Sequence, residues 1–299
     1  LAVSSIAYDP TADTVFYVGT GEGWNNSDAI RGAGIWKSTN AGTSFSQLSS
    51  TANSSFITVQ KVIVLKTGRI VAVTNGGIYT SDNDGVSFTR RRSGFHADIE
   101  EAANGVLYAT FGKIYSSGKI YRSTNDGTTW TDITPSGGSP DRIELACAPS
   151  DSNTIYAVSS DLPTAAQTDV EWFKKSTDGG SSWTNVTIPT YLSNSSKHFT
   201  RGQAWYDLIL WVHPTDKNVV IAGGVDLHRS TNGGTSWTSI SYWNSSQSKP
   251  VVHADQHNVI SRPGNNNEIL IGNDGGVYYS SNAGNKNTSS PTFSKRVKG

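Results

Sequence analysis

The sequence predicts an all-β protein, a six-bladed β-propeller made of four-stranded antiparallel blades. Three observations predict this fold. One eight-residue phrase occurs six times, its copies start 42 to 54 residues apart, and no stretch of ten or more residues carries the apolar stripe of an amphipathic helix. A period of this length is typical of stacked supersecondary units, which bury their apolar faces against their neighbours.

The repeated phrase has the chemistry of a tight hairpin turn. Its third position is Asn or Asp, whose side chain can accept hydrogen bonds from the backbone ahead of it. Its fifth position is Gly, which adopts a positive φ without steric cost. Five copies end in Phe or Trp, and the sixth is degenerate; they start at Ser38, Ser81, Ser123, Ser176, Ser230 and Ser280. We interpret the phrase as a structural element, because Asn usually stands where a catalytic acid would be needed.

Each copy of the phrase lies within a sequence pattern of four short strands. In the third repeat these strands are expected at Ala97–Ala102, Val106–Ala109, Lys119–Arg122 and Trp130–Ile133. Turns rich in Pro, Asp and Asn separate the first strand from the second. A β-sandwich is the alternative, but it does not predict one turn recurring about every fifty residues. The sequence leaves open whether the last blade is completed by Thr292–Val297 or by a strand of the first blade.

These repeats resemble the Asp-box (BNR) repeats of sialidases, xyloglucan-specific endoglucanases, the sortilin ectodomain and many secreted bacterial proteins. The last repeat, with His253–His257 and Gly272–Ser280, is most similar to the secreted bacterial group. In that group further repeats often follow, so residues 1–299 are either one propeller domain or part of a longer precursor. The resemblance implies a propeller with Asp-box turns.

The resemblance does not extend to a catalytic motif. Sialidases carry Phe/Tyr-Arg-Ile-Pro ahead of the first Asp box, whereas the first ten residues here contain no arginine, and Arg142-Ile143 is followed by Glu144. Sialidase activity is therefore not expected, and no xyloglucanase catalytic motif can be transferred.

Composition argues against two classes of partner. Lys plus Arg and Asp plus Glu both total 24, so no net charge attracts nucleic acid. No apolar run reaches the roughly 20 residues that a membrane-spanning helix needs. The abundance of Ser, Thr, Asn and Gly is typical of a secreted or cell-surface protein. No cofactor is expected, and the oligomeric state is left open.

Candidate site residues come from the starts of the first strands and from the longer loops between the second and third strands, because these segments lie at one end of a blade. Carboxylates that could serve as a catalytic pair are Asp98, Glu144, Asp207 and Asp255. Candidate ligand-binding residues are Glu22, Trp24, Arg142, Trp172, Trp205, His253 and His257.

A metal site at His253, Asp255 and His257 is not expected. Strand alternation places the three side chains on one face, but the two histidines would lie about 13 Å apart, too far for one ion. Asp274, in Asn273–Gly276, is interpreted as part of a hairpin turn.

Three functions are compatible with these residues. The first is a binding or structural module that presents one face to a glycan or an extracellular protein. The second is a glycoside hydrolase, which requires two carboxyl groups about 5–5.5 Å or about 6.5–9.5 Å apart. The third is a scaffold subunit of a cell-surface assembly. The separation and exposure of the four carboxylates distinguish the second function from the others.

Overall fold

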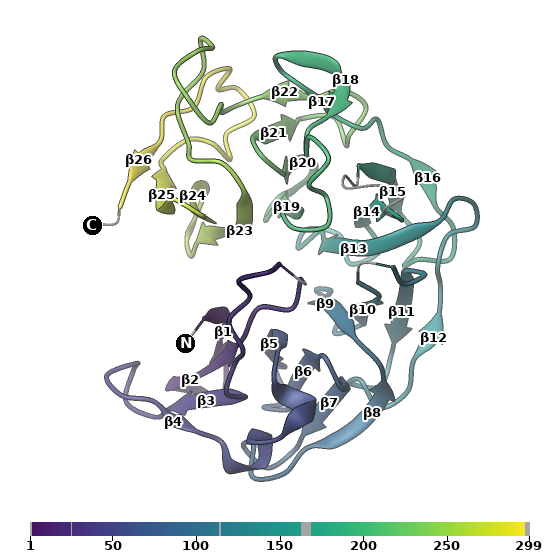
Figure 1. The fold of residues 1–299 in the computed structure, drawn as a ribbon, viewed down its shortest axis with the longest axis vertical. Coiled ribbons are helices and arrows are strands. Elements are labelled where there is room, and N and C mark those ends of the chain that lie inside the picture. Colours follow the sequence, from purple (N-terminus) through teal and green to yellow (C-terminus); the bar gives the residue numbers. More distant parts are fainter. Residues whose placement is uncertain (1, 25, 114, 163–168, 297–299) are drawn as a thin grey trace. The chain divides into compact units, whose positions relative to one another are not determined.

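The computed structural model describes residues 2–24, 26–113, 115–162 and 169–296. It contains six four-stranded antiparallel sheets, each with its strands in sequence order, so the predicted six-bladed β-propeller fold is confirmed (Figure 1). The chain divides into two compact units, which are described separately. Unit 1 comprises residues 1–134 and 141–143, and unit 2 comprises residues 135–140 and 144–299.

Unit 1 contains three blades. Blade 1 consists of β1 (Val3–Asp9), β2 (Ala12–Thr20), β3 (Ile35–Ser38) and β4 (Ser46–Gln47). Two short 3-10 helices, η1 (Ser49–Thr51) and η2 (Ser54–Phe56), lead to blade 2, which consists of β5 (Val59–Val64), β6 (Ile70–Thr74), β7 (Gly77–Ser81) and β8 (Thr89–Ser93). Blade 3 consists of β9 (His96–Glu101), β10 (Leu107–Phe111), β11 (Lys119–Ser123) and β12 (Thr131–Asp132).

Unit 2 contains blades 4 to 6, except for residues 141–143 of the first strand of blade 4, which belong to unit 1. Blade 4 consists of β13 (Pro140–Cys147), β14 (Ile155–Asp161), β15 (Val170–Ser176) and β16 (Thr184–Asn185). A small hairpin that the repeat pattern did not predict, β17 (Thr190–Tyr191) and β18 (Asn194–His198), precedes blade 5. Blade 5 consists of β19 (Ile209–His213), β20 (Asp216–Gly223), β21 (Leu227–Ser230) and β22 (Thr238–Ser239), and blade 6 of β23 (Gln256–Arg262), β24 (Asn265–Asn273), β25 (Gly276–Ser280) and β26 (Ser294–Lys295).

The open question about the last blade is answered by β26. This strand pairs with β25, through Tyr278 opposite Lys295 and Tyr279 opposite Ser294. The fourth strand of blade 6 therefore comes from the predicted C-terminal segment.

Strand alternation builds the core between neighbouring blades. In β6, Ile70 and Ala72 face blade 1, and Val71 and Val73 belong to the cluster shared with blade 3. Blade 5 shows the same division, since Leu210 packs toward blade 4 and Ile209 toward blade 6. Both faces of these sheets are apolar, which stabilises the stack by roughly 1.5–3 kcal/mol for each fully buried aliphatic side chain.

The repeated turn has the hydrogen bonds expected from its sequence. In five copies the first-position Ser Oγ accepts a bond from the Gly backbone N–H at 2.8–3.0 Å. The Asn or Asp Oδ1 accepts another from the seventh residue at 2.8–3.0 Å. In the sixth copy, Asn282 Oδ1 accepts from Thr292 N instead. These turns connect the third and fourth strands and leave the opposite end of each blade for other loops.

Candidate functional site

Four connections of blades 5 and 6 meet in unit 2. They are the segment before β19 (201–208), the β20–β21 turn (224–226), the segment before β23 (253–255) and the β24–β25 turn (274–275). In an antiparallel meander, the entry to the first strand and the turn between the second and third strands lie at the same end. Backbone contacts join the two blades here, since Gln256 N donates to Gly224 O at 2.9 Å.

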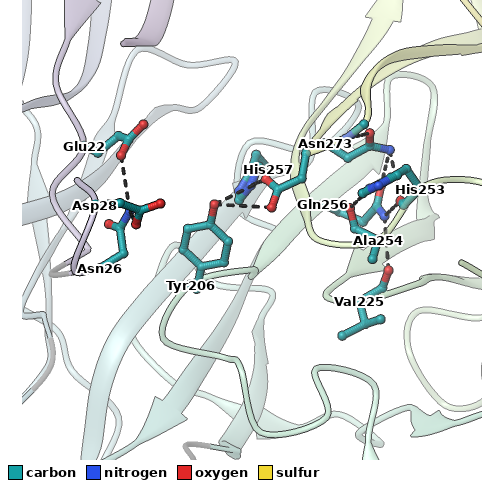
Figure 2. Close-up of polar contacts among 12 residues, drawn as sticks. Glu22, Asn26, Asp28, Tyr206, Val225, His253, Ala254, Gln256, His257 and Asn273 are labelled. Atoms are coloured by element: carbon teal, nitrogen blue, oxygen red, sulfur yellow. Dashed lines mark hydrogen bonds and ion pairs between the residues drawn. The ribbon is translucent and has the colours of Figure 1, made fainter. Parts of the chain in front are cut away.

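A partly exposed cluster of Tyr206, His257 and Asp274 lies at this end. His257 Nε2 lies 2.7 Å from Asp274 Oδ1, and Tyr206 Oη donates to the same oxygen at 3.3 Å. Figure 2 shows Tyr206 and His257 directed toward each other, with their rings in edge-to-face contact at a centroid distance of 4.9 Å. The side chains of His257 and Asp274 remain 34% and 38% exposed. Trp205 extends the aromatic surface, with its ring 5.4 Å from that of Tyr206.

A polar network holds the segment before β23 in place. Gln256 Nε2 donates to Val225 O at 3.2 Å and to His253 O at 2.6 Å. Asn273 Nδ2 donates to His253 O at 3.1 Å and to Gln256 Oε1 at 3.3 Å (Figure 2). The His253 side chain itself is exposed. Gln256 and Asn273 therefore fix the loop, and His253 and His257 occupy its accessible side.

Three carboxyl groups lie beneath this surface. Asp207 and Asp226 are fully buried, and Asp255 is partly buried with a φ of 63°. Burial, and then the charge of Asp274, raise the pKa of Asp255. The neighbouring Asp207 side chain acts in the opposite direction and lowers the pKa of Asp255.

Asp226 is a buried acid whose pKa is strongly raised. Burial raises its pKa to about 7, and the charge of Asp255 acts in the same direction. The backbone of Trp243 and the charge of Arg201 act in the opposite direction and lower the pKa of Asp226. Neither carboxylate oxygen of Asp226 has a well-formed hydrogen bond. Asp226 is therefore largely protonated below neutral pH.

The predicted site residues of unit 1 take part in three separate sets of contacts. The guanidinium carbon of Arg142 lies 3.8 Å from the Trp24 ring centroid, so these two residues cover each other. Glu22 accepts from Ile30 N and from Asn26 Nδ2, both at 3.2 Å, and stabilises its own loop (Figure 2). Asp98 is 2% exposed and bonded to Lys61 Nζ at 2.8 Å. An ion-paired, buried Asp98 is poorly placed to reach a substrate.

The remaining predicted residues of unit 2 lie on strands of blade 4. Trp172 is in β15 and only 6% exposed, so its ring packs within the blade. Glu144 is half-buried in β13. Residues 163–168 of the predicted loop Asp161–Glu171 lie outside the described residues.

Sequence reasoning missed two residues of the exposed cluster. Asp274 was assigned to turn formation because Asn273–Gly276 has the composition of a hairpin turn, and the side chain of a turn residue gives no signal of what it contacts. Tyr206 stands between two predicted residues, Trp205 and Asp207, which was the available signal. Among the described residues, no three metal-ligating side chains converge on one point.

A search for membrane-spanning segments covered the described residues. No helix among them has the length and apolar character needed to cross a bilayer.

Comparison with known proteins relates the chain to xyloglucan-degrading enzymes. No family model matches it. The chain is 26% identical over 247 residues to a xyloglucanase of Hypocrea jecorina (strain QM6a), an alignment that covers 80% of this chain and 25% of that protein. The GH74 enzyme of Niastella koreensis superimposes with a TM-score of 0.68 at 18% identity, over 98% of this chain and 46% of the other.

A GH74 xyloglucanase from Xanthomonas campestris gives a TM-score of 0.67 at 17% identity, over 98% of this chain and 47% of the other. The chain thus spans about a quarter of the curated relative and less than half of these solved chains. It is a β-propeller similar to those of glycoside hydrolases.

Proposed function

We propose that this chain binds a β-linked glucan of the xyloglucan type on the exposed surface of blades 5 and 6. The observation that carries the proposal is the contact of Tyr206 and His257 with the partly exposed Asp274 carboxylate. The similarity to xyloglucanases supports this choice of glycan. A binding module for a cell-wall-type polysaccharide would act outside the cell, so the proposal includes a secreted or cell-surface location.

The cluster has the two chemistries that a sugar requires. The C–H face of a pyranose ring packs on an aromatic ring, and Trp205 and Tyr206 supply such rings with their polar atoms at the edge. Sugar hydroxyls donate well to a carboxylate, and bonds to a charged acceptor are stronger than neutral ones. Asp274 and His257 lie beside the rings, where the hydroxyls of a stacked sugar would extend.

Replacing Asp274 with asparagine tests the binding function. Hydrogen bonds to charged groups contribute about 1.5–3 kcal/mol, so D274N should weaken xyloglucan-oligosaccharide binding by roughly 10- to 100-fold in isothermal titration calorimetry. Asp178→Asn is a matched control, because it introduces the residue that the other five copies of the turn have at this position. Equal affinity in wild type and D274N, or no binding by wild type, would contradict the proposal.

Hydrolysis is a second candidate function, favoured by the different environments of Asp255 and Asp274. Asp255 is partly buried with a raised pKa, as a general acid needs, and Asp274 is an exposed carboxylate. The two residues are adjacent, because Asp274 N donates to Asp255 O at 3.4 Å. The predicted catalytic residue Asp255 would protonate the leaving oxygen, and Asp274 would act on the other side of the bond.

Reducing-sugar release from xyloglucan distinguishes hydrolysis from binding alone. If Asp255 is the general acid, Asp255→Asn should lower the rate by about 10²- to 10⁴-fold and leave oligosaccharide affinity within about threefold. Asp178→Asn again serves as the control. Should the wild-type chain bind oligosaccharide and release no reducing ends, the hydrolase candidate fails and the binding function stands.

A further inference from the structure

Trp243 is an exposed aromatic residue of unit 2 that the site above does not include. It lies in the connection between β22 and β23, and it is 41% exposed. Its indole Nε1 donates a hydrogen bond to Tyr191 Oη at 3.0 Å, from the hairpin β17–β18. The single polar group of the ring is thus bonded within the protein, and the accessible part of the ring is apolar.

A chain of hydroxyl groups holds this ring in position. Tyr191 Oη donates to Tyr242 Oη at 2.7 Å, and Tyr242 Oη donates to Ser193 Oγ at 3.0 Å. The two tyrosine rings stack with a centroid distance of 5.7 Å and are each 4% exposed. Because each donor has an acceptor, the arrangement defines one orientation of the indole. Such a ring loses little conformational entropy when a ligand packs on it.

Arg201 links this cluster to the proposed glycan site. Its guanidinium carbon lies 4.6 Å from the Tyr191 ring centroid, and it belongs to the segment 201–208 that also carries Trp205 and Tyr206. Asp226 provides a second link, since it interacts with the Trp243 backbone and with the charges of Arg201 and Asp255. Trp243 and the Tyr206–His257–Asp274 cluster therefore flank the same group of loops.

We infer that Trp243 forms a second sugar-stacking subsite of the glycan-binding surface, with Arg201 donating to sugar hydroxyls between the two aromatic positions. This inference rests on the proposed function. The ligand is an extended oligosaccharide that places one sugar on Trp205 and Tyr206 and another on Trp243. A monosaccharide or a single short unit occupies only one of these positions.

Affinity as a function of oligosaccharide length tests the inference. Calorimetric titration of xyloglucan oligosaccharides of one, two and three repeating units should show affinity rising with length in the wild type. Trp243→Ala should weaken binding of the longest ligand by roughly 5- to 10-fold and leave that of the shortest unchanged. Tyr191→Phe keeps the ring and removes the acceptor for the indole, so a loss of about 2- to 3-fold on the longest ligand is expected.

Controls separate this inference from the binding function itself. Tyr8→Ala removes an exposed aromatic residue of unit 1, 64% exposed, and should not alter affinity at any length. Equal weakening by W243A at every length would show that the substitution disturbs the main site, and would overturn the second subsite. No weakening by W243A, with D274N still impaired, overturns the subsite and leaves the proposed function standing. Absence of wild-type binding at all lengths overturns both.

Discussion

Replacing Asp226 with asparagine is expected to stabilise unit 2 at pH 8, by about 2–4 kcal/mol in the free energy of unfolding. Asp226 is fully buried, and burial raises its pKa to about 7. At pH 8 the native protein therefore holds a buried negative charge near Asp255. Asparagine has nearly the shape of the protonated acid and carries no charge, so it removes this penalty and keeps an acceptor for the Trp243 backbone.

The pH dependence has a definite sign. Between the ordinary pKa of 3.8 and the raised value of about 7, native Asp226 binds more protons than unfolded Asp226, so it lowers stability as pH rises through this window. His96 and His228 have the opposite effect on stability, because burial lowers the pKa of each from 6.5 to about 4. Their contribution to the free energy of unfolding therefore increases as pH rises from 4 to 6.5. We therefore compare the free energy of unfolding of D226N with that of the wild type at each pH, because the histidine contributions cancel in this difference.

Urea denaturation of both proteins from pH 4 to pH 8 measures this difference. It should be small near pH 4 and reach its full value above pH 7. Asp178→Asn is the control, because hydrogen bonds from Ser182 hold the pKa of this exposed residue at about 2 and it is ionised in native and unfolded chains above pH 5. A D226N difference that is constant over the whole range would mean that Asp226 does not change its protonation on folding.

The fold was predictable because its determinants are local in sequence. Ser38 Oγ and Asn40 Oδ1 accept hydrogen bonds from backbone N–H groups within the same eight residues. The alternation of Ile70, Val71, Ala72 and Val73 assigns the side chains of β6 to the two faces of the blade. The hairpin β17–β18 was missed because it interrupts the repeat and has little apolar alternation. Its strands are mostly exposed, and Tyr191 is the buried anchor.

The site was only partly predictable, because it depends on contacts between blades. Asp207 and Asp255 precede adjacent first strands, and the Asp207 side chain lowers the pKa of Asp255. Their proposed catalytic role stays a prediction. Their burial could not be read from sequence, since it depends on how the loops around Asp226 pack. Trp24 and Arg142 were each proposed as ligand-binding residues, but a side chain that stacks on another cannot be distinguished by sequence from one that awaits a ligand.

Alanine at Gly234 is expected to destabilise the protein far more than alanine at Gly42, although both glycines occupy the fifth position of the repeated turn. Their φ angles are similar, 87° and 81°, so both variants incur the strain of a left-handed residue, about 1 kcal/mol. A Cβ at Gly234 would lie 2.3 Å from Val186 Cγ1, whereas at Gly42 the nearest atom, Phe45 Cζ, is 3.9 Å away. Overpacking adds about 1–3 kcal/mol to the Gly234 variant alone.

This difference arises because the turns also connect blades. Gly234 lies against Val186 at the end of blade 4, and its carbonyl accepts from Thr187 N at 3.1 Å. Gly85 has the same relation to blade 1, where a Cβ would lie 2.5 Å from Leu48 Cδ1. Gly42, in the first blade, has no neighbour of this kind within 4 Å. Each unit therefore has a repeated turn that closes its own hairpin and also packs against the preceding blade.

Hydrogen exchange measured by mass spectrometry suits this comparison, because it reports stability blade by blade when two units do not unfold together. Gly234→Ala should accelerate exchange in β14 to β21, on both sides of the Val186 contact. Gly42→Ala should affect only β3 and β4. Equal acceleration by the two substitutions would mean that backbone strain accounts for the whole effect, and that the glycine is needed for its φ angle rather than for the approach of one blade to the next.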